Sequence, residues 1–317
     1  MTDQAQGGMM SAPEMKDGMI RVAGGQFWMG SDDHYPDEGP AHPASVDAFW
    51  IDETPVTNAQ FARFVEATGH VTVAETVPDA ADYPGADPAM LKAGSSLFTP
   101  PPTPVPLHDP MGWWTFSFGA DWRHPLGPQS SIDGLADHPV VHIACADAGA
   151  YAAWAGKRLP TEAEWEFAAR GGLDRKAFAW GDELHPGGAM LANTWQGDFP
   201  HQNDLSDGYL RTSPVRAYAA NGFGLWDMIG NVWEWTSDWY VDRHDAPTKP
   251  CCAPHNPRGA SEDASRDPYS GFPRRVLKGG SHLCAPNYCQ RYRPAARYPQ
   301  TVDTSTSHIG FRCARDA

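Results

Sequence analysis

Short apolar runs bounded by glycine mark the start of the regular pattern in this chain. The run 19–22 (Met-Ile-Arg-Val) and the segment 24–31 combine apolar residues with flanking glycines, which is typical of short strands that end in turns. Residues 1–18 contain no comparable pattern. We therefore predict a disordered leader at 1–18 and a folded domain at 19–317.

Helical spacing first occurs at 55–65. Phe61, Phe64 and Val65 stand at i, i+3 and i+4, so that all three would lie on one face of a helix. Gly69 follows closely, and glycine is the residue type that most often ends a helix. The pattern predicts a helix over 55–65 that ends near Gly69.

Two further helices are predicted at 147–155 and 160–171. The second has the clearer signals, because Thr161 and Glu164 form a capping-box pattern at its start and Gly171 can end it. A well-capped helix of this kind is most often only structural.

Long stretches of the chain have no regular period. Segments 78–110 and 242–275 are rich in proline and predict two loop insertions, and the pattern after residue 172 is one of short strands and turns. The chain has 31 glycines and 30 prolines in 317 residues and no internal repeat, which indicates a loop-rich single domain. The fold class we expect is α+β with little regular secondary structure.

The overall composition excludes several classes of protein. The net charge of −15 argues against a nucleic-acid partner, which requires a basic face. No apolar run approaches the length of a membrane span, and no basic and apolar leader marks a secretory signal. Six irregularly spaced cysteines do not form a disulfide framework for a chain of this length. We expect a cytoplasmic protein with no membrane or nucleic-acid partner.

The most informative chemistry is the cysteine pair Cys284 and Cys289. Lys278, Arg291 and Arg293 flank the pair in sequence, and nearby positive charge favours the thiolate, which is the nucleophile and the metal ligand. Two soft sulfurs close together suit a soft ion such as Cu(I), or a reversible disulfide. The spacing alone is not specific, so a structural pair stays open as an alternative.

Residues between and before the two cysteines favour a functional site. Ser281 and Tyr288 place hydroxyl groups beside the sulfurs, and Gly279 and Gly280 permit close approach of the backbone. These neighbours raise the functional interpretation above the structural one without deciding between them.

Two other segments, 193–209 and 227–234, are rich in oxygen donors around glycine turns. Calcium takes six to eight oxygens and commonly mixes carboxylates with backbone carbonyls. Neither segment matches the EF-hand loop, so ordinary turn chemistry of Asn and Asp is the alternative to a calcium site.

Taken together, seven motifs resemble the formylglycine-generating enzymes, the sulfatase-modifying oxidases. The resemblance runs from about residue 19 to the C-terminus, and the Ser/Cys/Tyr/Cys cluster marks the catalytic branch of the superfamily. The matching segments are 24–30 (Gly-Gly-Gln-Phe-Trp-Met-Gly), 56–61 (Val-Thr-Asn-Ala-Gln-Phe), 154–166, 192–197, 230–235 (Gly-Asn-Val-Trp-Glu-Trp), 278–281 with the cysteine pair, and 310–313.

The resemblance implies a single α+β domain related to the C-type lectin fold. It also implies a reaction: oxidation of a cysteine in a Cys-x-Pro-x-Arg segment of a sulfatase to formylglycine, with molecular oxygen and copper. The expected partner is an unfolded or nascent sulfatase polypeptide, and we expect the enzyme to be a monomer.

The family's functional residues fall on specific positions of this chain. By the resemblance, Cys284 and Cys289 hold Cu(I), while Ser281, Tyr288 and Trp233 shape the catalytic pocket. Arg291 and His308 would contact the substrate. Two structural calcium sites are implied at Asn193, Thr194, Asp207 and Tyr209, and at Asp227, Gly230, Val232 and Glu234. Of these eight, Thr194, Tyr209, Gly230 and Val232 would contribute backbone carbonyls.

The chain departs from the family pattern in ways that bear on its activity. His282 and His308 stand where many relatives have tyrosine and asparagine, so we expect the rate or the substrate preference to differ. Cys313 lacks the disulfide partner of secreted relatives, and Cys251-Cys252 is interpreted as a pair of loop thiols.

Two other functions remain as alternatives. One is a paralogue that keeps the domain and only binds peptides or proteins; the absence of the two cysteines would mark it. The other is an iron-dependent sulfoxide synthase, which usually has an additional N-terminal helical domain.

Overall fold

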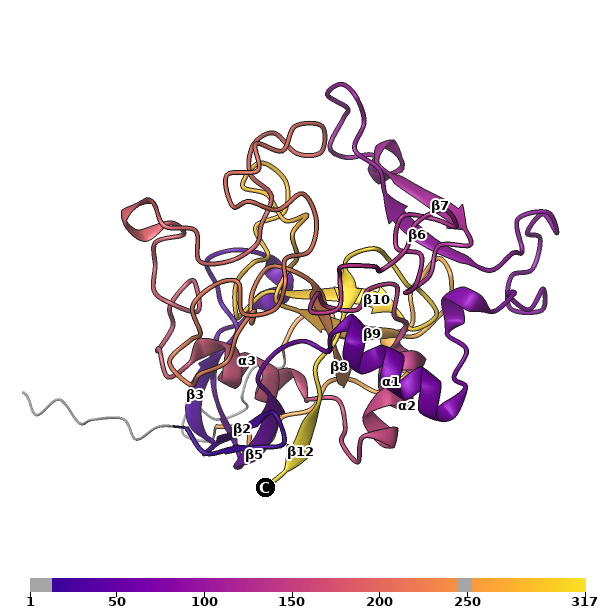
Figure 1. Cartoon of the computed structure of the whole chain (residues 1–317). Helices are drawn as coiled ribbons and strands as arrows, with labels where there is room; N and C mark the ends of the chain where they lie inside the picture. The colour runs from indigo at the N-terminus through magenta and orange to yellow at the C-terminus, as the bar shows by residue number, and fades with distance from the viewer. Residues whose placement is uncertain (1–12, 245–252) are drawn as a thin grey trace, which may run out of the picture.

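The computed structural model describes residues 13–244 and 253–317, and two four-stranded sheets form its centre (Figure 1). The first sheet has the order β1-β2-β5-β12, in which each neighbouring pair is antiparallel. Its strands join the two ends of the domain, because β12 lies at the C-terminus. They are β1 (Met15–Lys16), β2 (Met19–Val22), β5 (Phe49–Asp52) and β12 (Ala314–Asp316).

The second sheet has the order β10-β9-β8-β11, with β8 and β11 parallel and the other pairs antiparallel. It leads directly to the cysteine segment, which follows β9. Its strands are β8 (Trp233–Trp239), β9 (Arg274–Lys278), β10 (Arg297–Thr301) and β11 (Ile309–Gly310).

Two strand pairs stand beside these sheets. The pair β3 (Gly25–Met29) and β4 (His42–Val46) packs against the third helix. The pair β6 (Gly94–Phe98) and β7 (Trp114–Phe118) stands apart from the larger sheets, at the upper right of Figure 1.

The described part of the chain has three α-helices, which are α1 (Asn58–Thr68), α2 (Cys145–Trp154) and α3 (Glu162–Arg170). Helix α1 begins three residues later than the apolar spacing predicted, because Thr57 caps it and the Gln60 side chain accepts the Thr57 amide at 2.8 Å. Gly69 ends it in the left-handed conformation, as predicted. Five single turns of 3₁₀ helix complete the set: Pro36–Glu38, Val73–Glu75, Pro110–Gly112, Pro186–Gly188 and Asp263–Ser265.

The prediction for α3 is confirmed in detail. Thr161 and Glu164 form the reciprocal capping box, and Gly171 ends the helix at a φ of 57°. Trp165 on this helix is fully buried in an apolar cluster with Ile20 and Phe49 of the first sheet, and its Nε1 donates to Glu234 on β8 at 2.8 Å. A second apolar cluster packs α1 and α2 against β8 and includes Phe61 and Phe64.

Three of the predicted boundaries need correction. Regular structure begins at β1 within the predicted leader, because residues 15–16 pair with residues 19–20; residues 1–12 lie outside the described residues. The insertion 78–110 is not wholly irregular, since strand β6 forms within it by pairing with β7. The insertion 242–275 already contains the first residues of β9, and Cys251-Cys252 lies outside the described residues. In the described part of the chain, no helix has both the length and the apolar character needed to cross a membrane.

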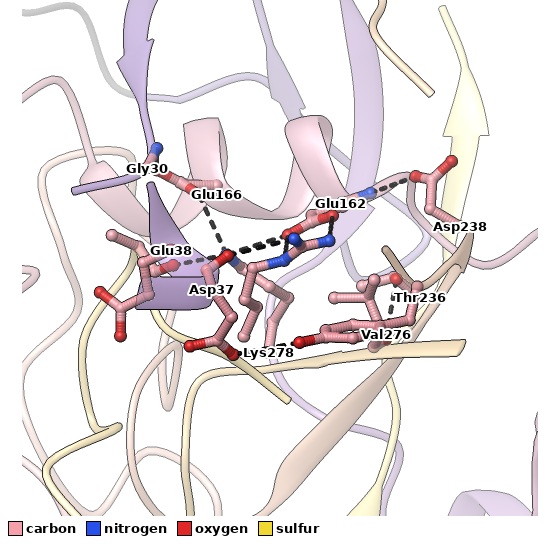
Figure 2. Close-up of polar contacts among 12 residues, drawn as sticks. Gly30, Asp37, Glu38, Glu162, Glu166, Thr236, Asp238, Val276 and Lys278 are labelled. Carbon is pink, nitrogen blue, oxygen red and sulfur yellow. Dashed lines mark hydrogen bonds and ion pairs between the residues drawn. The ribbon is translucent and has the colours of Figure 1, made fainter. Parts of the chain in front are cut away.

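A buried ion network connects α3 to the end of β9 (Figure 2). Glu166 on α3 accepts Lys278 Nζ at 3.0 Å, Arg170 Nη2 at 2.6 Å and the Gly30 amide at 2.8 Å. Burial alone would raise the pKa of Glu166, but the charges of Lys278 and Arg170 outweigh it and lower the pKa to about 2. The expectation that Lys278 lies beside the cysteines is therefore wrong: its side chain is fully buried and turned into this network.

The same network continues along the helix and the neighbouring loop. Glu162 pairs with Arg297 at 2.8 Å, and Glu38 pairs with Arg293 through two hydrogen bonds. The Glu162 amide donates to Asp238 at 2.6 Å (Figure 2). Buried charges of this kind are tolerated only when each has a partner. The network holds the base of the cysteine segment in place.

Candidate functional site

One cleft, with a volume of about 420 Å³, is lined by all seven residues that were predicted for the catalytic and substrate-binding site. They come from segments far apart in the chain, since Trp233 opens β8, five others follow β9, and the last precedes β11. The seven are Trp233, Ser281, Cys284, Tyr288, Cys289, Arg291 and His308.

A double-glycine turn directs the chain from β9 into the cleft. Gly279 and Gly280 both have positive φ, 92° and 71°. A Cβ atom at Gly279 would lie 2.9 Å from the Met228 carbonyl oxygen, and one at Gly280 would lie 2.8 Å from the Arg291 carbonyl oxygen. Only glycine fits both the backbone conformation and the space. The turn therefore separates the buried Lys278 from the cysteines.

The two cysteine sulfurs face one another without a disulfide bond. Cys284 Sγ lies 3.2 Å from Cys289 Sγ, whereas a disulfide would require about 2.05 Å, and both residues are free thiols. Cys284 is buried and accepts the Ser281 amide at 3.4 Å, while Cys289 is partly exposed to the cleft. The sequence prediction of a soft two-sulfur site is matched by this geometry.

The two thiols differ in acidity. Burial, together with the hydrogen bond to Cys289, raises the pKa of the Cys284 thiol well above its ordinary value. The hydrogen bond from Cys284 lowers the pKa of Cys289, with burial opposing and the charges of Arg291 and Arg293 assisting. Cys289 is therefore the more acidic thiol of the pair, and Cys284 is the less acidic one.

Arg291 closes one side of the cleft. Its guanidinium donates to Asp37 Oδ2 at 2.8 Å and to the Arg297 carbonyl oxygen. It lies 4.0 Å from the centre of the Tyr35 ring and 5.6 Å from that of Tyr298. Arg291 is thus fixed in position, with its charge close to Cys289.

Aromatic rings that the sequence did not assign to the site form much of its wall. Phe199 stacks on Tyr288 with ring centres 4.6 Å apart, and Trp113 meets Tyr288 edge to face at 5.3 Å. On the other side, Tyr298 lies 5.7 Å from Trp233. The only sequence signal for this wall is the large number of tryptophans, 13 in the chain, and that number does not say which rings meet.

Three neutral histidines lie at or behind the cleft. His308 is partly buried, and its ring centre lies 4.9 Å from that of Trp114. Its ring also hydrogen-bonds Thr306 Oγ1. Burial lowers its pKa well below the ordinary value, and burial likewise lowers the pKa of His282 and of His142 to about 4. His282 does not line the cleft; its ring bonds the Asn231 carbonyl oxygen at 2.8 Å. Only His308 of the three can meet a ligand in the cleft.

The first predicted calcium set shows a feature that suits a cation. Asp207 Oδ2 is buried and has no hydrogen-bond partner in the described part of the chain. Burial raises the pKa of Asp207, while the amides of Tyr209 and Thr194 oppose the rise. The Asn193 side chain, one residue before Thr194, is buried and donates Nδ2 to the Arg211 carbonyl oxygen at 2.8 Å. A carboxylate with one buried, unpartnered oxygen, together with backbone carbonyls and a nearby amide, fits a calcium ion.

The second predicted set of calcium ligands has less unpaired charge to offer a cation. Glu234 is paired with Arg312 at 2.7 Å and also accepts Trp165 Nε1 at 2.8 Å, so that protein groups already balance its charge. Among the described residues, Asp227 has no such cation at hydrogen-bond distance; it accepts the Arg216 amide at 2.8 Å, and burial raises its pKa. A Cβ at Gly230 would lie 2.4 Å from the Asn193 carbonyl oxygen, so the two predicted sets lie close together.

No three His, Cys, Asp or Glu side chains come together as a metal centre in residues 13–244 and 253–317. Both predicted calcium sets depend on amide and backbone oxygens, and the predicted copper set on two sulfurs alone. Cys313 is fully buried in the core as a free thiol, in agreement with the expected loss of its disulfide partner.

Comparisons with known proteins place the chain in a family. The family model described as "Sulfatase-modifying factor enzyme 1-like domain" matches residues 5–317. The formylglycine-generating enzyme of Mycobacterium tuberculosis is 55% identical over 300 residues, which are 94% of this chain and 97% of that protein. The "Inactive C-alpha-formylglycine-generating enzyme 2" of Mus musculus is 36% identical over 320 residues, 98% of this chain and 91% of that protein.

Among solved structures, PvdO from Pseudomonas aeruginosa is similar with a TM-score of 0.63 and covers 94% of each chain, at 23% identity. That likeness concerns the fold alone, which is a single domain of mixed helix and sheet. The family match over nearly the whole chain, and the high identity to a curated relative, confirm the resemblance found in the sequence. The chain belongs to the formylglycine-generating enzyme family.

Proposed function

We propose that this protein oxidises a cysteine in a Cys-x-Pro-x-Arg segment of a sulfatase polypeptide to Cα-formylglycine, with molecular oxygen and copper. The observation that carries the proposal is the unbridged pair of thiols, 3.2 Å apart, on the wall of an open cleft. The most similar relative reported above is named for the same product. The reaction removes sulfur and one hydrogen from the β-carbon of the substrate cysteine and leaves an aldehyde.

The donor set suits Cu(I). Two thiols of one short loop present soft sulfurs, and the pKa of one of them, Cys289, is lowered, which favours its thiolate form. Cys284 and Cys289 would hold the ion, and copper would supply the activation of oxygen that no side chain can perform. No carboxylate lines the part of the cleft wall that the structure describes.

The chain's own residues then bind and orient the substrate. Ser281 Oγ is fixed by the Leu283 amide at 3.2 Å and stands next to Cys284, where it can hydrogen-bond a sulfur or oxygen atom of the substrate. The Arg291 guanidinium assists the hydrogen bond from Cys284 in lowering the pKa of Cys289 and can orient a carbonyl of the peptide. The rings of Trp233 and Tyr298 exclude water from one side.

We also propose calcium as a structural cofactor, chiefly at Asn193, Thr194, Asp207 and Tyr209. The support is the unpartnered oxygen of Asp207. For the second set, Asp227 with the carbonyls of Gly230 and Val232 carries the proposal, and Glu234 would take part only while it remains paired with Arg312. A monomeric, cytoplasmic enzyme with a fold related to the C-type lectins stays our prediction.

Of the alternatives, a binding module without catalysis is disfavoured by the retention of both thiols in the cleft. A sulfoxide synthase would require histidine ligands for iron, and His308 is the single histidine that lines the cleft in the described part of the chain. The oxidase therefore fits the site best.

The test is mass spectrometry of a Cys-x-Pro-x-Arg peptide incubated with protein, Cu(I), a reductant and oxygen. We expect the aldehyde product with the natural protein and none with Cys284→Ser or Cys289→Ser, because a hydroxyl is a poor ligand for Cu(I). Ser281→Ala should still bind copper and be about 10- to 1,000-fold slower, as for the loss of one catalytic hydrogen bond. Near-normal turnover by either cysteine variant, with its fold verified by circular dichroism, would overturn the proposal.

A further inference from the structure

One face of the β6–β7 hairpin continues the wall of the cleft outward. Ser96 and Trp114 on this face both line the cleft. The register places Phe98 opposite Trp114 and Ser96 opposite Phe116, so these four side chains share a face. On the opposite face, the buried Ser95 of β6 hydrogen-bonds His142 of the body of the protein at 2.7 Å.

Beyond the cleft this face is aromatic and exposed. Trp114, Phe116 and Phe118 alternate along β7 and form what we name the β7 stripe. Phe116 is 44% exposed and Phe118 is 37% exposed, with their ring centres 5.8 Å apart. Isolated exposed apolar residues are common, but a row of three that begins inside a functional cleft indicates a binding surface.

The backbone of β7 is also open to a partner. Strand β6 is attached to the body, since the Ser96 amide donates to the Ser305 carbonyl oxygen at 3.2 Å and the Ser307 amide donates to Ser96 at 3.0 Å. Strand β7 pairs with β6 alone among the strands of residues 13–244 and 253–317, which leaves its outer edge unpaired. An unpaired edge can accept an extended peptide as an added strand.

The proposed substrate must leave the cleft in an extended form. Five residues of extended chain span about 16 Å, and the polypeptide continues on both sides of the modified cysteine. An extended chain presents side chains to one face about every 6.6 Å, which is close to the spacing of the two phenylalanine rings.

We propose that the β7 stripe binds the segment of the substrate polypeptide that flanks the modified cysteine, as an extended strand with apolar side chains at alternate positions. The inference rests on the proposed function, and it adds that the enzyme selects unfolded chains with apolar flanks. A folded protein could not present such a segment, because its apolar strands would already be buried.

The experiment compares peptides of two kinds. One is the five-residue Cys-x-Pro-x-Arg peptide, and the other carries a six-residue extension before or after it, with leucine at alternate positions. With the natural protein, we expect one of the two extended peptides to have a KM about tenfold below that of the short one. In the double variant Phe116→Ser/Phe118→Ser, the ratio of the two KM values should fall to near one.

Two matched controls isolate the stripe. Tyr269→Ser removes an aromatic ring that is 97% exposed and does not line the cleft, and it should keep the tenfold ratio. An extension with serine in place of leucine should give no gain. Direct titration with peptides in which serine replaces the reactive cysteine gives the same comparison as dissociation constants, without turnover.

The possible outcomes are distinct. If the natural protein modifies none of the peptides, the proposed function fails. If it modifies the short and extended peptides with equal KM, or if the double variant keeps the tenfold ratio, the oxidase assignment stands and the role of the β7 stripe is wrong.

Discussion

The buried ion network around α3 and the cleft beside it are separated by one turn, Gly279-Gly280. The two regions differ in how fully their ionisable groups are paired. In the network, every carboxylate meets a cation: Glu166 meets Lys278 and Arg170, and Glu162 meets Arg297. In the cleft, Cys289 is the more acidic thiol, because the hydrogen bond from Cys284 and the nearby charge of Arg291 lower its pKa. Each carboxylate of the network is thus already paired with a cation, whereas the acidic thiol of the cleft stays available to a ligand.

This difference separates stability from activity within one short stretch of chain. Lys278 is fully buried and contributes to the fold, while Ser281, three residues later, faces the cleft. Removal of one partner from a buried network leaves an uncompensated charge and is costly. Changes among the cleft residues should instead affect turnover more than unfolding.

The largest expected effect on stability follows from Glu166→Gln, which keeps the shape of the side chain and leaves Lys278 without its closest carboxylate. We expect a loss of about 3–5 kcal/mol in the free energy of unfolding. Measurement by urea denaturation would check it, with the exposed surface pair variant Asp182→Asn as the control that should change little.

The pH dependence sharpens the same prediction. The folded-state pKa of Glu166 is lowered to about 2 from an ordinary value of 4.5. Its contribution is therefore complete above about pH 4.5 and is lost as the pH falls toward 2. The Glu166→Gln variant should lack this part of the acid dependence. An unchanged acid limb would show that the network is not what holds the base of the cysteine segment.

Asp207 is the exception to the comparison, because it is a partly buried carboxylate whose Oδ2 has no hydrogen-bond partner in the described part of the chain. If calcium is its partner, added calcium should raise the free energy of unfolding. The expected rise is about 2.7 kcal/mol when the free calcium concentration is a hundred times the dissociation constant. Thermal melting with calcium and with a chelator would measure the shift, and Asp207→Asn should reduce it. Equal melting temperatures in both conditions would contradict the calcium assignment.

The sequence predicted local structure wherever a local signal existed. The capping box at Thr161 and Glu164, and the glycine stops at Gly69 and Gly171, predicted two helices because a helix end is satisfied by residues within one turn of it. Strands β2 and β3 were likewise predicted. Strand β6 was missed, since its partner lies beyond a proline-rich loop and the pairing, rather than the local sequence, makes it a strand.

The candidate site was predicted in the same uneven way. Motifs carry the reactive residues, so the cysteine pair and its five neighbours in the cleft could be named from the sequence and the family resemblance. The aromatic wall could not, because Trp113, Phe199 and Tyr298 come from separate segments of the chain and have no shared spacing. The role of Lys278 was misjudged, since nearness in sequence says nothing about the side of a glycine turn to which a side chain points.

The smallest expected effect concerns the two thiols themselves. In metal-free protein, Cys289 should react with iodoacetamide at least about tenfold faster than Cys284 near pH 7, because thiolate is the reactive form. The pKa of Cys289 is lowered and its side chain is partly exposed, whereas burial raises the pKa of Cys284. Peptide mass spectrometry after short reaction times gives the order directly. Cys313 serves as the internal control, since it is fully buried in the core and should stay unmodified while the fold is intact. Modification of Cys284 first, or of both cysteines at one rate, would show that Cys289 is not the more acidic thiol. The cleft would then lack the acidic group that distinguishes it from the ion network.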